Sequence, residues 1–171
     1  MRKIIVITCF LALATAALAV DFPKAEVFGG YQYTRLEGGV NANGFEFAVN
    51  GSFNDWFGIT GDIGAAYKSE GGVSFNNYTY TFGPVLSVRA NKAYTPYVHL
   101  LIGGDHTSAG VSGVGSAGAS GFALMAGGGV DFNLGEHLAF RAAQADWFLV
   151  HGSGGTSSKN ARISTGIVFR F

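Results

Sequence analysis

The sequence is poor in cysteine and in charged residues. Its single cysteine, Cys9, lies in the apolar run that opens the chain, so no disulfide framework is available. Charged residues make up only 13% of the chain, which is about half the share usual in soluble proteins. The basic residues form no patch, so we expect no nucleic-acid partner. After residue 19, no apolar stretch reaches the length of a transmembrane helix.

The first nineteen residues have the pattern of a secretory signal peptide. Arg2 and Lys3 precede an apolar run that ends at residue 16, and Ala17 and Ala19 form a small-x-small cleavage motif. The run is too short for a membrane-spanning helix, and the alternative is a buried N-terminal helix. The sequence therefore predicts export, with a signal peptide at 1–19 and one mature domain at 20–171.

Alternation of apolar and polar residues is the main pattern in the mature domain. It predicts eight strands of roughly 10–14 residues, and a tilted strand needs about 9–11 residues to cross a bilayer. Short turns are expected after the second, fourth and sixth segments, and longer, mobile loops after the odd-numbered ones. The expected turns lie at 54–55, 90–93 and 133–137, and the expected loops at 36–43, 68–76, 107–120 and 151–160.

One face of these segments is apolar and rich in aromatic residues, whereas the other carries most of the charge. A sheet that spans hydrocarbon must close on itself, because each unpaired edge group costs several kcal/mol. The pattern predicts an all-β fold, an eight-stranded antiparallel up-and-down transmembrane β-barrel with a polar lumen. A soluble barrel with the apolar face inward is the alternative, since alternation does not say which face is wet. The predicted lumen charges are Glu26, Glu46, Asp62, Arg89, Asp131, Arg141, Asp146, Arg162 and Arg170.

Closure of the barrel predicts which of these charges meet, because the first and last segments become neighbours. The predicted pairs are Glu26 with Arg170, Asp131 with Arg141, and Asp146 with Arg162. Such pairs either neutralise one another in a plug or exchange partners to open a narrow channel. We favour the plug, since an eight-stranded lumen is just wide enough for its own side chains.

The seventh segment contains a conflict of parity. Arg141 lies on the opposite face from Gln144 and Asp146 in a regular strand, although all three suit the lumen. The sequence therefore predicts either a β-bulge between Arg141 and Gln144, or an Arg141 that extends to the rim of the barrel.

Several segments together resemble a known family. The stretches EVFGGYQYTR, GFEFAVNGSFNDWFGITGDIGAAY, TPYVHLLIGG, FALMAGGGVDF, RAAQADWF and RISTGIVFRF look like the outer-membrane β-barrel domain family, which is related to the transmembrane part of outer-membrane protein A. GGGVD followed by R-x-x-Q-x-D resembles the variant common in acidobacteria. The resemblance covers essentially the whole mature chain.

This resemblance implies an eight-stranded barrel in the outer membrane of a Gram-negative bacterium. It also implies delivery by periplasmic chaperones and insertion by the barrel-assembly machinery, which recognises a terminal strand ending in phenylalanine, here Phe169 and Phe171. We expect a monomer whose other partners are outer-membrane lipid and lipopolysaccharide. No peptidoglycan-binding domain follows Phe171, so anchoring to the cell wall is not expected.

Chemical activity has weak support in the sequence. His151 and Ser153 form a His-x-Ser pair of the kind found in an outer-membrane lipid A deacylase, but the stretch that follows contains no acid to orient the histidine. His99 and Tyr97 face the lumen by parity, and no second histidine or cysteine stands at metal-ligand spacing. We expect no enzyme, no cofactor and no metal. A structural or surface role comes first, a narrow porin-like channel second, and a lipid A-modifying enzyme third.

Overall fold

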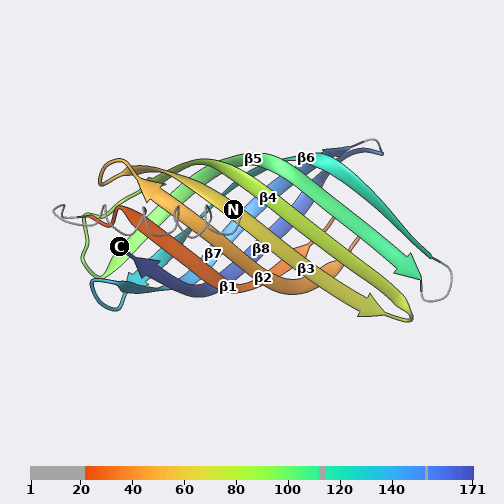
Figure 1. The fold of residues 1–171 in the computed structure, drawn as a ribbon, viewed down its shortest axis with the longest axis horizontal. Coiled ribbons are helices and arrows are strands. Elements are labelled where there is room, and N and C mark those ends of the chain that lie inside the picture. Colours follow the sequence, from red (N-terminus) through yellow and green to blue (C-terminus); the bar gives the residue numbers. More distant parts are fainter. Residues whose placement is uncertain (1–21, 112–114, 153) are drawn as a thin grey trace, which may run out of the picture.

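The computed structural model describes residues 22–111, 115–152 and 154–171, which form eight strands and no membrane-length apolar helix. Each strand pairs antiparallel with its neighbours in sequence, and β1 also pairs with β8 (Figure 1). The predicted closed, eight-stranded barrel is confirmed. The strands are β1 (Ala25–Arg35), β2 (Asn41–Ser52), β3 (Phe57–Glu70), β4 (Val73–Ser87), β5 (Tyr94–Val111), β6 (Gly115–Asn133), β7 (Leu138–Gly152) and β8 (Gly155–Arg170).

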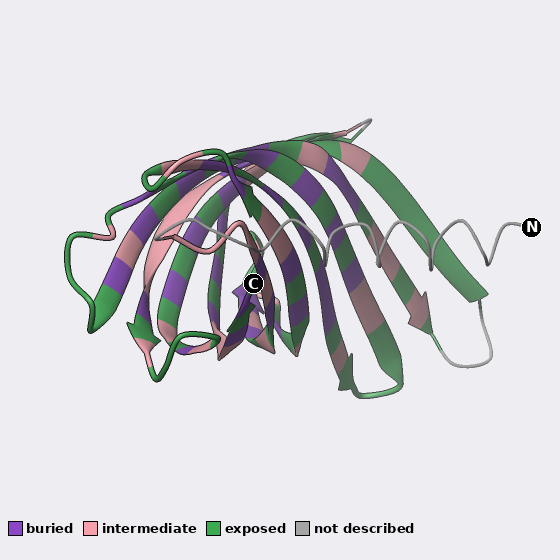
Figure 2. Cartoon of the chain, turned by 60° about the vertical axis from the view of Figure 1, so that its left-hand side comes forward, coloured by how far each residue is buried: buried purple, intermediate pink, exposed green. Residues whose placement is uncertain are grey.

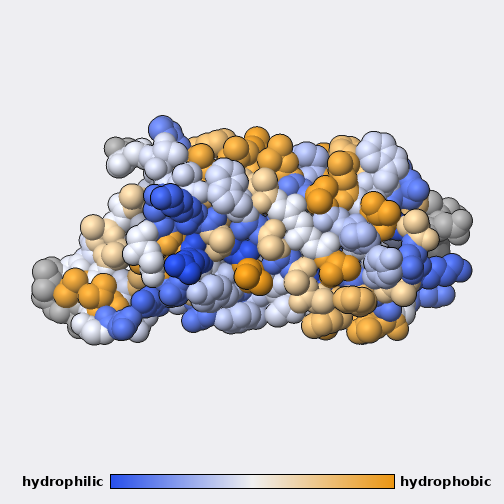
Figure 3. Space-filling view, turned by 180° about the vertical axis from the view of Figure 1, so that it is seen from behind, coloured by the Kyte–Doolittle hydropathy of each residue, from blue (hydrophilic) through white to orange (hydrophobic). Residues whose placement is uncertain are grey.

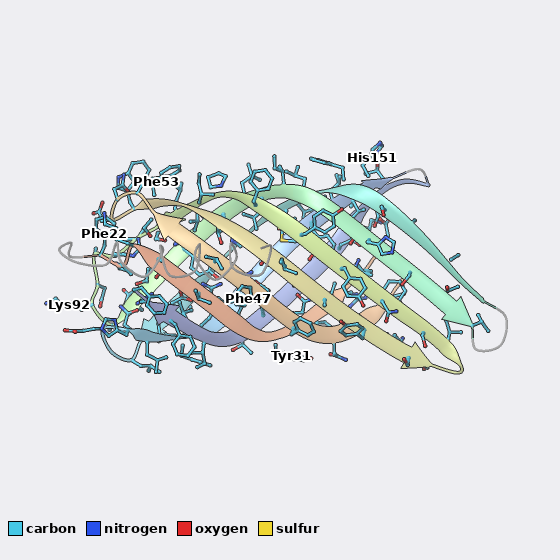
Figure 4. All side chains as sticks on the ribbon, viewed as in Figure 1. Phe22, Tyr31, Phe47, Phe53, Lys92 and His151 are labelled. Carbon is cyan, nitrogen blue, oxygen red and sulfur yellow. The ribbon has the colours of Figure 1, made fainter. Side chains whose placement is uncertain are left out.

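The predicted signal peptide and its cleavage motif, Ala17 and Ala19, lie outside the described residues. Phe22 and the C-terminus lie at one end of the barrel, which we call the terminal end (Figures 1 and 4). The tips of the β3–β4, β5–β6 and β7–β8 hairpins extend from the opposite end, which we call the hairpin end (Figure 1). His151 marks the hairpin end in Figure 4.

Closure leaves the sheet without a free edge. Glu26 of β1 stands opposite Arg170 of β8, and the pairing continues to Arg35 opposite Ala161. Backbone groups of the first and last strands therefore satisfy one another, as they must where no water is available.

The wall presents apolar residues outward and polar residues inward. Phe45, Phe82 and Ile163 are 54%, 59% and 54% exposed, whereas Glu46 and Arg162 are 1% and 2% exposed. Figure 2 shows the resulting alternation of buried and exposed residues along each strand. In Figure 3 apolar side chains are spread along the visible wall, and strongly hydrophilic side chains lie in the left half of the view, toward the hairpin end, and at the right-hand edge. A soluble barrel has the reverse arrangement, so that alternative is wrong.

Three of the four predicted long loops are largely strand, which corrects the sequence-based boundaries. β3 and β4 are joined by Gly71 and Gly72 alone, at φ +60° and +79°, so 68–76 is a tight hairpin. The predicted loops at 36–43, 107–120 and 151–160 likewise lose residues to the flanking strands, and several strands exceed the predicted length. Small residues there have no apolar period, but their backbones still pair across the hairpin.

Turns at the terminal end agree with the sequence. Between β2 and β3 the Asn54 side chain accepts hydrogen bonds from the amides of Trp56 and Phe57, at 3.0 and 2.7 Å. This local bond fixes a tight turn, as asparagine commonly does. The turns after β4 and β6 fall at the predicted positions.

A β-bulge interrupts β7 between Arg141 and Gln144, as the parity of the sequence predicts. Asp131 of β6 pairs with Arg141, whereas its neighbour Val130 pairs with Ala143, so Ala142 is the extra residue. The bulge turns Arg141, Gln144 and Asp146 to the same side of the wall. Arg141 consequently reaches the lumen instead of the rim.

Candidate functional site

The lumen holds a network of charged side chains with Arg162 of β8 at its centre. The Arg162 guanidinium makes a bidentate contact with Asp62 of β3, with Nη1–Oδ1 and Nη2–Oδ2 distances of 2.8 and 3.1 Å. Its Nε lies 2.8 Å from Asp146 Oδ2 and 3.4 Å from Glu46 Oε2. One cation is therefore shared by three buried carboxylates.

Neutral side chains hold these carboxylates in place. The amide of Gln144 donates from Nε2 to both Glu46 Oε1 and Asp146 Oδ2, each at 2.8 Å, and the hydroxyl of Ser164 donates to the other oxygen of Glu46. His99 Nε2 lies 2.7 Å from Asp146 Oδ1. Glu46 and Asp146 thus have several partners each, and Asp62 has the bidentate contact with Arg162, which is how buried charges are tolerated.

Two glycines of the wall leave room for this cluster. A Cβ atom on Gly127 of β6 would lie 2.0 Å from Asp146 Oδ1. A Cβ atom on Gly64 of β3 would lie 2.7 Å from both Gln32 Oε1 and Thr79 Oγ1, and 3.1 Å from Arg162 Nη1. Asp146 therefore packs on the backbone of its neighbouring strand β6, and Arg162 lies close to the backbone of β3 across the lumen.

Arg141 forms a second centre, nearer the terminal end. Its guanidinium lies between the rings of Phe28 and Tyr97, 4.2 and 4.5 Å from their centroids. Its Nε and Nη2 donate to Asp131 at 2.8 and 3.2 Å, and its Nη1 donates to Gln144 Oε1 at 2.7 Å. Because Gln144 also contacts Glu46 and Asp146, the two centres form one continuous network.

Glu26 is the centre of a third cluster, at the terminal end. Glu26 Oε1 accepts from Arg170 Nε at 2.8 Å, and Oε2 accepts from Arg89 Nη2 at 3.0 Å and from Asn50 Nδ2 at 2.8 Å. Arg170 also donates to Asn133. Two guanidinium groups here share one carboxylate, which is the reverse of the balance around Arg162.

Side chains fill the middle of the barrel. Leu101, Met125 and Phe148 form a buried apolar cluster beside Arg162, which lies 3.2 Å from Met125 Sδ. The cavity beside Tyr97 and His99 has a volume of about 30 Å³, roughly that of one water in the liquid. Wider openings of about 480 and 460 Å³ lie at the hairpin end and at the terminal end.

The three predicted pairs are all formed, but the sequence missed most of their further contacts. Glu26 meets Arg170, Asp131 meets Arg141, and Asp146 meets Arg162. Asp62 and Glu46 reach Arg162 across the lumen from strands that are not its neighbours. Asp105 is also buried in the lumen, where Asn77 and Thr107 donate to it. Asp105 shares the parity of Tyr97 and His99 on β5, but no cross-lumen contact follows from parity.

Of the His-x-Ser pair considered for chemistry, the described part of the chain contains His151. His151 is exposed on the outer wall, and its Nδ1 lies 2.6 Å from Thr156 Oγ1 (Figure 4). Ser153 lies outside the described residues. Among the residues that the structure describes, no three His, Cys, Asp or Glu side chains form a group able to hold a metal ion. Phe169 and Phe171, the predicted assembly signal, are outward and each 52% exposed.

Closure, an apolar wall and a polar interior define a transmembrane β-barrel. The sequence model of the outer membrane protein beta-barrel domain matches residues 5–171, and the chain belongs to this family. The predicted resemblance is thereby confirmed, and the protein is located in the outer membrane of a Gram-negative bacterium. No curated protein matches the sequence at a significant level.

Solved outer-membrane barrels share the fold. Ail, the attachment invasion locus protein of Yersinia pestis, is 21% identical, with a TM-score of 0.63 over 88% of this chain and 99% of that one. Neisserial surface protein A is 12% identical, with a TM-score of 0.66 over 86% and 96%. The N-terminal β-barrel domain of Pseudomonas aeruginosa OprF is 12% identical, with a TM-score of 0.58 over 88% and 100%. At these identities the likeness concerns the fold alone.

Proposed function

We propose that this protein is a closed outer-membrane barrel with a structural or surface role, and that its lumen is a plug of side chains. The proposed orientation places the terminal end toward the periplasm and the hairpin end toward the outside of the cell, because outer-membrane barrels have short periplasmic turns and longer outer loops. The hairpins are the part of the chain that the barrel presents to the surroundings of the cell. No enzymatic activity is part of the proposal.

The observation that supports the plug most strongly is the setting of Arg162. Its side chain is 1% exposed and contacts carboxylates from β2, β3 and β7, so it ties together strands around the barrel. Opening a path through this layer requires an arginine and three carboxylates to give up their partners. Breaking buried ion pairs of this kind typically costs about 3–5 kcal/mol each.

Ion conductance tests the proposal. The purified protein, reconstituted in planar bilayers, should give no current steps at any voltage or pH at which it remains folded. A regular single-channel conductance from the unmodified protein would contradict the proposal and support the porin-like channel. A channel gated by exchange of partners would also change its conductance in Glu26→Ala or Arg170→Ala, whereas a plug should stay silent in both.

The enzyme alternative has a separate test. Because His151 contacts Thr156 on the outer wall, and no carboxylate contacts it among the described residues, we expect lipid A to remain intact. Mass spectrometry of lipid A from cells with and without the protein measures this. Loss of an acyl chain that depends on His151 would overturn the non-enzymatic proposal.

A further inference from the structure

The periplasmic opening of the barrel is lined by more cations than carboxylates. Arg89, Lys92 and Arg170 line this opening of about 460 Å³, together with Asn91 and Asn133. Glu136 is the only carboxylate among the residues that line it. The exposed side chain of Lys92 makes no ion pair with any described residue.

The two arginines share a single carboxylate. Arg89 Nη2 and Arg170 Nε both bond to Glu26, at 3.0 and 2.8 Å. The nearby Asp131 is already held by Arg141 at 2.8 Å and lies 3.8 Å from Arg170 Nη2, beyond hydrogen-bond distance. The opening therefore has an excess of positive charge, to which Lys92 adds.

Each of these two arginines has an N–H donor that no described protein atom accepts. Arg170 is 6% exposed, yet its Nη2 donates no hydrogen bond to any described protein atom, and the same holds for Arg89 Nε. Buried donors without an acceptor are rare and costly, since each loses its hydration without replacement. An acceptor that carries negative charge would serve these donors best, because charge-assisted hydrogen bonds are the stronger kind.

We infer that the periplasmic opening is a binding site for a small oxyanion, the phosphate or carboxylate group of a periplasmic solute. The guanidinium groups of Arg89 and Arg170 form the base of the site, and Lys92 contributes charge at its entrance. Guanidinium groups suit such ligands because they present several N–H donors in one plane. The inference rests on the orientation in the proposed function but not on the plug, because the residues that line the site all lie at the terminal end.

Calorimetric titration of the full protein in detergent, with inorganic phosphate and separately with acetate, tests the inference. Phosphate should bind saturably, and Arg89→Gln should weaken binding by about tenfold, the value of one charge-assisted hydrogen bond. Lys92→Ala should weaken it by about fivefold, as expected for one lost charge at contact distance in water. Acetate, with one fewer charge, should bind at the same site but more weakly.

Two further variants test whether phosphate binding depends on the charges at this opening. Glu136→Gln removes the negative charge at the opening and should strengthen phosphate binding. Arg35→Ala removes an exposed cation at the hairpin end and should change nothing. Gel mobility before and after heating shows whether each variant is folded. Absence of saturable binding, or equal binding by Lys92→Ala, Arg89→Gln and Arg35→Ala, would overturn the inference. If acetate binds and phosphate does not, the ligand is a carboxylate and the phosphate assignment is wrong.

Discussion

At the scale of single residues, the lumen combines two opposite charge balances. Arg162 is one cation among three carboxylates, whereas Glu26 is one carboxylate between two arginines. Arg141 lies between the two clusters. It donates to Gln144, which contacts Glu46 and Asp146, and to Asp131, whose Oδ2 lies 3.8 Å from Arg170 Nη2. The charge balance of the lumen therefore depends on the network as a whole and not on isolated ion pairs.

Gly127 offers a direct test of how closely the charged cluster packs on the wall. Gly127→Ala places a methyl group where Asp146 Oδ1 now lies, so Asp146 must leave Arg162 and His99. We expect the free energy of unfolding in urea to fall by about 2–4 kcal/mol, the cost of stranded buried polar groups.

Gly61→Ala is the matched control for this substitution. Gly61 faces outward, and a Cβ atom there meets no atom within 4 Å. Its free energy of unfolding should stay within about 1 kcal/mol of the unmodified protein. Equal losses in Gly61→Ala and Gly127→Ala would show that packing on Asp146 is not the cause.

The sequence predicts the face of a residue far better than its partner. The alternation of apolar and polar residues correctly predicts that Glu46, Asp62 and Arg162 face inward, because a one-residue shift of strand register would place charge in lipid. It could not join Asp62 to Arg162, since the two lie on strands far apart in the sheet and meet only across the lumen. Such contacts depend on the diameter of the barrel and on side-chain length.

At the scale of elements, the bulge in β7 decides where Arg141 points. Deleting Ala142 should leave a regular strand in which Arg141 and Gln144 stand two positions apart, so both side chains still face the lumen. We expect its free energy of unfolding to stay within about 1 kcal/mol of that of the unmodified protein. Deleting both Ala142 and Ala143 makes Arg141 and Gln144 adjacent, so a regular strand turns one of them away from the lumen, and we expect a loss of about 3–5 kcal/mol, as for other broken buried pairs. Equal stability of the two deletion variants would contradict this role for the bulge.

The connection between β1 and β2 is tied to β8 by Glu37, outside the membrane. Hydrogen bonds from Ser157 and from the backbone amide of Ser158 lower the pKa of the Glu37 carboxyl. A lowered pKa in the folded state means that the contact is complete above the ordinary glutamate pKa, about 4.3, and is lost as pH falls through the lower value. The connection should therefore loosen only in acid.

Hydrogen exchange at the Ser158 amide measures this contact. After correction for intrinsic rates, its protection should fall on acidification in the unmodified protein. Glu37→Gln retains an acceptor oxygen without a titrating group, so its protection should not change over the same pH range. Protection that is independent of pH in both proteins would refute the contribution of the Glu37 charge.

Strand ends were the least predictable elements. The hairpin-end segments are rich in Gly, Ser, Asn and Ala, and they lack an apolar period once the strand leaves the bilayer. Backbone pairing nevertheless continues, for example from Val111 opposite Gly115 along the β5–β6 hairpin. Hydropathy thus reports the part of a strand in contact with lipid, whereas pairing sets its full length.

At the scale of the whole molecule, closure of the sheet and filling of the lumen have separate physical causes. Pairing of β1 with β8 removes the sheet edge and permits insertion into lipid. Filling follows from the small diameter, in which side chains from opposite strands meet, and the cavity beside His99 has a volume of about 30 Å³. The openings at the two ends are consequently separated by a continuous layer of side chains.

The most direct test of this account is the water accessibility of that layer. Ser164 is 1% exposed and bonds to Glu46 in the middle of the lumen, whereas Thr156 is exposed at the hairpin end. In a Cys9→Ser background, Ser164→Cys and Thr156→Cys can be treated with a water-soluble maleimide in the folded state and after unfolding. The account predicts that the folded protein is labelled at position 156 but not at position 164, and that unfolding exposes both. Labelling at position 164 in the folded barrel, at a rate similar to that at position 156, would contradict it.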